Sequence, residues 1–441
     1  MLQFHTVFAL AFGICVALVL VLRPLAVRVG LVDVPDSRKR HSGPVPLIGG
    51  LAIFLTAVLV HSLPEIDKLP VYDPTATGFL LSGLVLVVVG LADDLFELSI
   101  GFRFIAQIAA ALVLVYASGA VLQDLGQLAP GAGHLGLGIL AVPFTVFATV
   151  GVINALNMCD GLDGLSGTQT MISLTGFAVA VGIWGEPTHG ALLALLAGAT
   201  AGFLLFNLRL PGLGKAVVFL GDAGSMFLGL ALAWCAIAFS QGPDAALSPA
   251  AALWFVLVPT IDAVAMMLRR ILKRRSPFYP DREHLHHIFL LAGFSVSQTV
   301  AIMAGIGAFG VAVGLISTWL DWPDMVIAGA FLGAGLLYLI MIMHAWRVMR
   351  LLGWPICRRR SAEPDRRVLT DRRMATCANF SGPERRSWLE RRHAHAPRRA
   401  SDRAVPRSES FQPSFDERLQ ADRGALPAAT GQAAVSTSKP R

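Results

Sequence analysis

Charged residues are scarce in this sequence. Asp, Glu, Lys and Arg together make up 15 % of its 441 residues, whereas roughly a quarter is usual for soluble proteins. Cysteine is scarce as well: the five cysteines are odd in number and show no metal-binding spacing, which argues against a disulfide framework. Hydrophobic residues, by contrast, make up 55 % of the chain, and the mean hydropathy is +0.63. This composition excludes an ordinary soluble protein and predicts one embedded in a membrane.

Long apolar runs recur along the chain, and each is about long enough to cross roughly 30 Å of hydrocarbon as a helix. The first run lacks the basic start and the cleavage site of a signal peptide, so we interpret it as an uncleaved span. The sequence therefore predicts an all-α polytopic membrane protein with about eleven transmembrane helices, of which the fifth and eighth are candidates for broken helices. The runs lie at approximately 4–22, 47–62, 77–92, 101–117, 137–153, 168–184, 189–206, 216–239, 248–268, 298–319 and 325–346.

The basic residues of the apolar part are distributed unevenly over the predicted loops. Only Lys68 falls on the loops of one side. Because loops rich in Lys and Arg stay in the cytoplasm, this bias predicts that the N-terminus lies outside and the C-terminus inside. The residues on the other side are Arg23, Arg28, Arg38, Lys39, Arg40, Arg103, Arg209, Lys215, Arg269, Arg270, Lys273, Arg274, Arg275 and Arg282.

From Arg347 onward the composition changes. Residues 347–441 contain 21 Lys and Arg against 10 Asp and Glu, and few large apolar residues. Such a segment cannot bury enough apolar surface to fold alone, so we predict a transmembrane domain at 1–346 and a basic, largely disordered cytoplasmic tail at 347–441. We expect the tail to bind anionic lipid headgroups, with a specific partner as the alternative. Because the tail carries the positive charge, the net charge of +7 gives no reason to expect nucleic-acid binding.

Acidic residues gather at the predicted cytoplasmic ends of several apolar segments. A solvated helix end explains one isolated Asp, but clustered carboxylates repel one another unless they share a cation. Because this cluster offers only oxygen donors, we expect Mg²⁺, with Mn²⁺ as the alternative. The stretches concerned are "GLADDLFELS" with Asp93 and Asp94, "NALNMCDGLDGLSG" with Asn154, Asn157, Asp160 and Asp163, and "FLGDAGSMFLG" with Asp222; Asp262 lies inside the ninth segment.

A histidine-containing loop is predicted on the same side of the membrane. It reads "RRILKRRSPFYPDREHLHHIF" and brings His284, His286 and His287 within four residues. A zinc site and a solvated loop are two interpretations of this spacing. We favour a third, in which histidine and arginine side chains donate hydrogen bonds to a pyrophosphate or a sugar, because Arg275 and Arg282 lie alongside.

Together these motifs resemble the polyprenyl-phosphate N-acetylhexosamine-1-phosphate transferases. The resemblance covers residues 1 to about 346 and rests on "DVPDSRKRHSGPVPLIGG", "GLADDLFELS", "NALNMCDGLDGLSG" and "FLGDAGSMFLG", in family order, followed by the histidine loop. The segment "SPFYPDREHLHH" looks like the loop of enzymes that use a UDP-GlcNAc donor rather than a UDP-MurNAc-pentapeptide donor. The Arg-rich tail lies outside the resemblance.

The resemblance implies a role for each matching residue. Asp222 would be the principal Mg²⁺ ligand, with Asn157 as a second oxygen donor. Asp93 would activate the lipid phosphate, supported by Asp94. Asp163, which we count with the catalytic residues, and Asp160 would hold the diphosphate region. Residues expected to bind the substrate are Asn154, Asp160, Phe219 (stacking on uracil), Lys39, Arg40, His41, Arg282, His284, His286 and His287.

The implied reaction transfers GlcNAc 1-phosphate from UDP-GlcNAc to undecaprenyl phosphate, with release of UMP, as the first step of O-antigen or related cell-envelope glycan synthesis. The enzyme would lie in the bacterial inner membrane with its site at the cytoplasmic face, and a homodimer is left open. A direct attack is favoured over a covalent aspartyl intermediate. Alternatives are another UDP donor (a UDP-N-acetyl-6-deoxyhexosamine or UDP-MurNAc-pentapeptide) and, from another class, a secondary transporter that uses Asp262.

Overall fold

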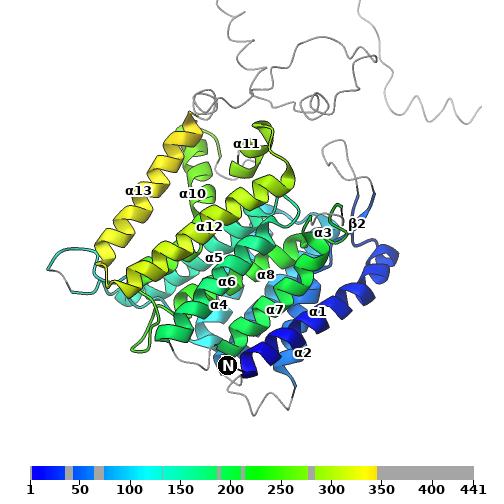
Figure 1. Cartoon of the computed structure of the whole chain (residues 1–441), viewed down its shortest axis with the longest axis horizontal. Helices are drawn as coiled ribbons and strands as arrows, with labels where there is room; N and C mark the ends of the chain where they lie inside the picture. The colour runs from blue at the N-terminus through cyan, green and yellow to red at the C-terminus, as the bar shows by residue number, and fades with distance from the viewer. Residues whose placement is uncertain are drawn as a thin grey trace, which may run out of the picture. The chain divides into compact units, whose positions relative to one another are not determined.

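The computed structural model describes residues 2–34, 43–63, 74–131, 133–185, 190–209, 214–276 and 284–344. Within these residues most of the chain is helical, and each of the eleven predicted apolar runs coincides with helix (Figure 1). The helices are α1 (Leu2–Val29), α2 (Gly49–His61), α3 (Pro74–Phe96), α4 (Ile100–Ser118), α5 (Ala141–Cys159), α6 (Leu165–Trp184), α7 (Gly190–Asn207), α8 (Gly221–Ala238), α9 (Pro249–Phe255), α10 (Leu257–Leu272), α11 (Leu285–Leu291), α12 (Val296–Trp319) and α13 (Asp324–Met343). Two short strands, β1 (Val32–Asp33) and β2 (Val45–Pro46), pair antiparallel.

Eight helices among the described residues are long and apolar enough to cross a membrane: α1, α3, α4, α5 with the turn before it, α7, α8, α12 and α13. The pair α9 and α10 adds a ninth if it counts as one span. Helix α2 has only 13 residues, and α6, although it has 20 residues, carries several Ser, Thr and Gln side chains. The prediction of an all-α, multi-pass membrane protein is confirmed, while the count of eleven spans and the orientation stay predictions.

The predicted breaks in segments five and eight do not occur, because α5 and α8 are continuous helices. The break lies in segment nine, where α9 and α10 meet at 88°. Pro259 has no N–H to donate to the carbonyl of Phe255, four residues earlier. That carbonyl accepts a hydrogen bond from the hydroxyl of Ser173 in α6 instead, at 2.6 Å. Proline and the hydroxyl together account for the bend.

Helix α8 forms the centre of the core. Nearly all its residues are buried, and its neighbours include α2, α3, α5, α6 and α9. Phe227 in α8 packs edge-on against Phe54 in α2 and tilted against Phe79 in α3, with ring centroids 5.3 and 5.5 Å apart. These ring contacts hold α2, α3 and α8 together and thereby fix the position of the N-terminus of α8.

Glycines let α2 and α3 approach the first turn of α8 closely. A Cβ on Gly50 would lie 2.1 Å from the Cα of Gly224, and a Cβ on Gly90 would lie 2.3 Å from the Cα of Ala223. Neither position could therefore take a larger residue without moving the helices apart. This contact brings the end of α3, which carries Asp93 and Asp94, beside the beginning of α8.

The end of the strand pair is hydrogen-bonded to the segment just before α8. The N–H of Phe219 donates to the carbonyl of Pro46, and the carbonyl of Phe219 accepts from the N–H of Gly49, both at 2.9 Å. The segment just before α8 is thereby fixed to the end of the first loop.

Candidate functional site

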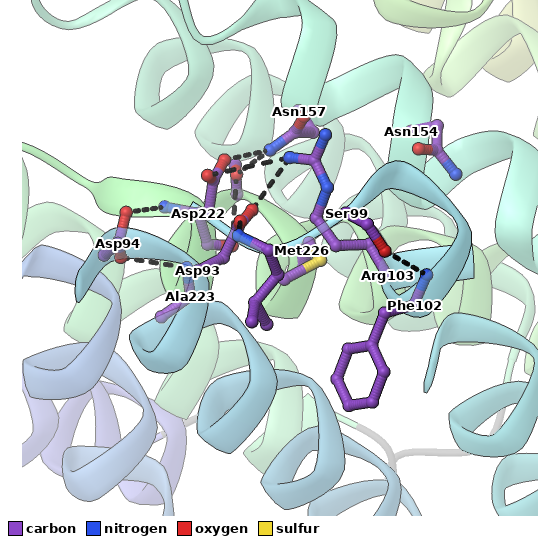
Figure 2. A network of polar contacts seen from close by, with 12 residues as sticks. Asp93, Asp94, Ser99, Phe102, Arg103, Asn154, Asn157, Asp222, Ala223 and Met226 are labelled. Atoms are coloured by element: carbon purple, nitrogen blue, oxygen red, sulfur yellow. Dashed lines mark hydrogen bonds and ion pairs between the residues drawn. The ribbon is translucent and has the colours of Figure 1, made fainter. Parts of the chain in front are cut away.

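Asp93 lies at the end of α3 and is buried, with 6 % of its surface exposed. One carboxylate oxygen accepts the N–H of Leu98 at 2.7 Å, which closes the turn after the helix. The other accepts Nη1 of Arg103, from the first turns of α4, at 2.8 Å (Figure 2). The carboxylate therefore joins α3 to α4 and forms an ion pair with the guanidinium of Arg103.

Asp94 faces the N-terminus of α8. Its two oxygens accept the backbone N–H groups of Asp222 at 2.9 Å and Ala223 at 3.5 Å (Figure 2). These are among the donors that the first turn of a helix leaves without an intrahelical partner, and a carboxylate there also interacts favourably with the helix dipole. Asp94 thus acts as a cap delivered from another helix.

Asp222 is more open than Asp93. Its side chain is 34 % exposed, compared with 4 % for Asp93. Oδ1 accepts Nδ2 of Asn157 at 2.7 Å, and the same Nδ2 contacts the hydroxyl of Ser225 at 2.8 Å. Oδ2 lies 3.9 Å from Nη1 of Arg103. Arg103 therefore stands between the carboxylates of α3 and α8, and Asn157 fixes one side of Asp222.

This donor set fits a hard divalent cation. Mg²⁺ usually takes only one or two protein carboxylates and keeps its remaining positions for water and phosphate oxygens. The described residues contain no group of three or more His, Cys, Asp or Glu arranged as a metal site, and Mg²⁺ needs no such cage. The guanidinium of Arg103 already lies close to both Asp93 and Asp222, which indicates that this pair of carboxylates accommodates a positive charge.

Asn154 lies one turn before Asn157 on α5 and pairs with a residue that the sequence did not single out. Its Nδ2 donates to Oε1 of Gln107 at 2.6 Å and to the carbonyl of Val150 at 2.8 Å. Gln107 follows Arg103 by four residues, so both lie on one face of α4. That spacing after "GLADDLFELS" is the only signal in the sequence that points to them.

Asp163 anchors the turn between α5 and α6. One of its oxygens accepts Nε of Arg209 at 2.6 Å and the N–H of Ala216 at 3.3 Å. The next residue, Gly164, adopts a positive φ of 82° and donates its N–H to the side chain of Asn207. Asp163 therefore ties residues 160–164 to the segment between α7 and α8.

Asp160 occupies the same turn, and its side chain keeps an exposed face. Protein atoms crowd the rest of the carboxyl, and this desolvation raises its pKa to about 7. The negative charges of Asp222 and Asp163 add to the rise. The charge effect indicates that Asp160 belongs to the same electrostatic group as Asp222.

The histidine loop meets this turn from the other side. His284 donates from Nδ1 to Asp262 of α10 at 2.9 Å, and His286 is almost completely buried. A Cβ on Gly161 would lie 2.4 Å from Nε2 of His286, so this ring rests on the backbone of the turn. Burial lowers the pKa of His286 to about 3, an effect that His287 reinforces and Asp262 opposes. His286 is therefore a neutral packing residue, and His287 is the more accessible of these two neighbours.

The remaining predicted residues have fewer described contacts or lie outside the described residues. Phe219 is half-buried next to Leu220 and Gly221, at the entrance to α8. Lys39, Arg40, His41 and Arg282 lie outside the described residues, as does the tail 347–441. The residues that the structure brings together are thus Asp93, Asp94, Asn157 and Asp222, with the 160–164 turn and His286 adjoining them.

Comparison with known proteins identifies the family of this chain. The model of glycosyl transferase family 4 matches residues 76–240, which contain all the carboxylates from Asp93 to Asp222. The undecaprenyl-phosphate alpha-N-acetylglucosaminyl 1-phosphate transferase of Escherichia coli (strain K12) is 34 % identical over 331 residues, 75 % of this chain and 88 % of that protein. The chain belongs to glycosyl transferase family 4.

Two further relatives of the same name are similar over the same extent. The protein of Haemophilus influenzae is 35 % identical over 331 residues, covering 75 % of this chain and 92 % of its own length. That of Yersinia pestis is 34 % identical over 337 residues, covering 76 % and 90 %. The resemblance drawn from the motifs is therefore confirmed. In this member of glycosyl transferase family 4, the region matched by the family model runs from α3 to just beyond α8 and includes the carboxylates but not the histidine loop.

Proposed function

We propose that this transferase moves GlcNAc 1-phosphate from UDP-GlcNAc to undecaprenyl phosphate, giving undecaprenyl-diphosphate-GlcNAc and UMP. The relatives carry that activity in their names. One structural observation carries the proposal: the carboxylates of Asp93, Asp94 and Asp222 meet at one end of the membrane helices, with Asp222 open. A phosphate of the lipid attacks the phosphorus that bears the sugar, and the bond from that phosphorus to the oxygen of UMP breaks.

Asp222 is the residue that would hold Mg²⁺, the ion that the oxygen donors favour. When bound, the metal would neutralise the diphosphate and stabilise the charge that develops on the departing UMP. Asn157 presents its nitrogen to Asp222, so in this arrangement it orients the carboxylate; a direct bond from its oxygen to the metal would require the amide to turn over. Asp94 fixes the first turn of α8, which determines where Asp222 points.

Arg103 and Asp93 would receive the lipid phosphate. A phosphate competes with carboxylates for a guanidinium, since both accept paired N–H groups. When Arg103 turns toward the phosphate, an oxygen of Asp93 is released to accept the remaining phosphate proton, which has a pKa near 6 and transfers easily at neutral pH. We favour direct attack by the lipid phosphate over a covalent aspartyl intermediate.

The donor would lie over the turn at 160–164. Gly161 of this turn is exposed and has no side chain of its own, so a ligand can approach its backbone closely. His287, Arg282 and the first-loop residues Lys39, Arg40 and His41 would contact the pyrophosphate or the sugar, and Phe219 the uracil. UDP-GlcNAc comes from water and the prenyl chain lies in the bilayer, so the site belongs at the cytoplasmic face of the inner membrane.

Other donors remain the alternatives within the same chemistry: a UDP-N-acetyl-6-deoxyhexosamine or UDP-MurNAc-pentapeptide. The transporter interpretation loses its main support, because Asp262 is engaged by His284 rather than placed alone in the bilayer. The test is a panel of UDP-sugars offered to the purified chain with undecaprenyl phosphate. We expect a lipid product whose mass corresponds to one added N-acetylhexosamine phosphate, with UDP-GlcNAc giving the fastest release of UMP. A product with UDP-MurNAc-pentapeptide alone would contradict the proposal.

A further inference from the structure

Asp262 is a buried carboxylate with several hydrogen-bond partners outside the site described above. It lies in α10, and its side chain is 4 % exposed. Its oxygens accept Nδ1 of His284 at 2.9 Å, the backbone N–H of Leu285 at 3.2 Å, and the hydroxyl of Tyr338 in α13. A carboxylate this deeply buried requires such partners. Three elements, α10, α11 and α13, are therefore joined at one group.

The first consequence concerns the ring of His284. An ionised carboxylate can only accept hydrogen bonds, so Nδ1 of His284 carries the proton that bonds to Asp262. This fixes both the tautomer and the plane of the ring, as a carboxylate does behind many functional histidines. The ring of His286 lies nearly parallel to it, with centroids 5.8 Å apart and planes inclined by 8°.

The second consequence concerns the donor turn. His286 contacts the backbone of Gly161 so closely that a Cβ there would lie 2.4 Å from Nε2. The same region is filled by an apolar cluster that includes Cys159 and Leu165, at the two sides of the turn, together with Val258 of α10 and Phe289 of α11. A displacement of the His284 ring would therefore displace the ring of His286, and His286 would in turn displace the backbone of Gly161.

We propose that Asp262 and Tyr338 are positioning residues for the donor. They fix the ring of His284, and through it the ring of His286, and the position of His286 places the 160–164 turn beneath the nucleotide sugar. This inference rests on the proposed function, since it assumes that the turn binds the donor. It gives the last helix, α13, a defined part in the site, through a single hydroxyl. It also separates the three histidines by role, with His284 and His286 as supports and His287 facing the substrate.

The role predicts a specific kinetic pattern. Loss of the Tyr338 hydroxyl in Tyr338→Phe should raise KM for UDP-GlcNAc about threefold, and Asp262→Asn should raise it roughly tenfold or more. KM for undecaprenyl phosphate should not change, and kcat should change less than the donor KM. Asp262→Glu, which keeps a carboxylate, should recover part of the loss. A purely structural role would instead lower the amount of active enzyme and leave both KM values where they are.

Coupling supplies the sharper test. If Asp262 acts through His284, Asp262→Asn should have almost no further effect on the donor KM in a chain that already carries His284→Ala, because residues that act as one unit are not additive. Matched controls are Tyr116→Phe, an exposed tyrosine of α4, and Asp244→Asn, an exposed aspartate between α8 and α9. Both should keep wild-type kinetics.

The assays use the purified full-length chain with UDP-GlcNAc and undecaprenyl phosphate, and thermal unfolding in detergent confirms that each variant is folded. An unchanged donor KM in both Tyr338→Phe and Asp262→Asn, or fully additive effects of Asp262→Asn and His284→Ala, would overturn the positioning role while leaving the proposed function intact. A wild-type chain that releases no UMP would overturn the proposed function and this inference with it.

Discussion

The carboxylate of Asp94 caps a helix to which it does not belong: it accepts the backbone N–H of Asp222, the second residue of α8, at 2.9 Å. Two adjacent aspartates of α3 thus contact Asp222 in different ways. Asp94 accepts a hydrogen bond from the backbone of Asp222, while the carboxylates of Asp93 and Asp222 both lie near the guanidinium of Arg103. The neighbouring positions therefore have different functions, and their variants should fail differently.

We expect Asp94→Ala to destabilise the protein. The change leaves the first N–H groups of α8 without their acceptor in a part-buried place, at a cost of about 1–3 kcal/mol in the free energy of unfolding. Asp94→Asn should lose less, since it keeps one acceptor oxygen. The measurement is the thermal unfolding midpoint in detergent, with Asp222→Asn as the matched control because it leaves this backbone contact intact. An Asp94→Ala chain as stable as the wild type would argue against the capping role.

Gly161→Ala should be poorly tolerated, although its backbone is not restricted to glycine. The added Cβ would collide with the ring of His286, and overpacking of this kind typically costs about 1–3 kcal/mol of stability. Combining it with His286→Ala should return part of the lost unfolding temperature. Gly151→Ala is the control, because the space around its Cβ is open. If the double variant is no more stable than Gly161→Ala alone, the collision is not the cause.

Acid should destabilise the protein through His286. Its pKa is about 3 in the folded state against 6.5 for the ordinary side chain, so the unfolded chain takes up the proton first as the pH falls. The stabilising contribution is complete above pH 6.5 and is lost progressively as the pH falls toward 3. Between pH 7.5 and 5 this amounts to at most about 2 kcal/mol.

The comparison is between the wild type and His286→Gln, whose side chain does not titrate. The drop in unfolding temperature from pH 7.5 to 5 should be smaller for His286→Gln than for the wild type. His5→Gln, at an exposed position of α1, should behave as the wild type does. Equal drops in the wild type and in His286→Gln would show that this histidine is not responsible.

Much of the fold follows from the sequence because hydrophobic length is a local property. Every apolar run coincides with helix, and the polar stretches fall at helix ends. The bend between α9 and α10 could not be located in this way. It depends on a hydroxyl of Ser173, which lies 82 residues from its partner Phe255, and hydropathy carries no information about such a contact.

The site shows the same division. Clustering of Asp93, Asp94 and Asp222 is predictable, since all three fall at one end of their helices. The individual contacts between these side chains are not predictable from the sequence. The capping role of Asp94, the nitrogen that Asn157 turns toward Asp222, and the place of Arg103 between two carboxylates arise from the packing of α3, α4, α5 and α8. Likewise, Asp262 draws attention as an acidic residue in an apolar segment, but only its partner His284 reveals what it does.

The central claim is that the carboxylates of α3 and α8 form one metal-dependent site for a nucleotide sugar. The most direct measurement is the release of UMP from UDP-GlcNAc by the purified chain with undecaprenyl phosphate, as Mg²⁺ is removed by a chelator and added back, in the wild type and in Asp222→Asn. The account predicts that the wild type loses turnover with the metal and regains it, whereas Asp222→Asn remains at least about a hundredfold slower at every Mg²⁺ concentration. Asp244→Asn should match the wild type. Near-normal turnover by Asp222→Asn, or turnover that persists without any divalent ion, would contradict it.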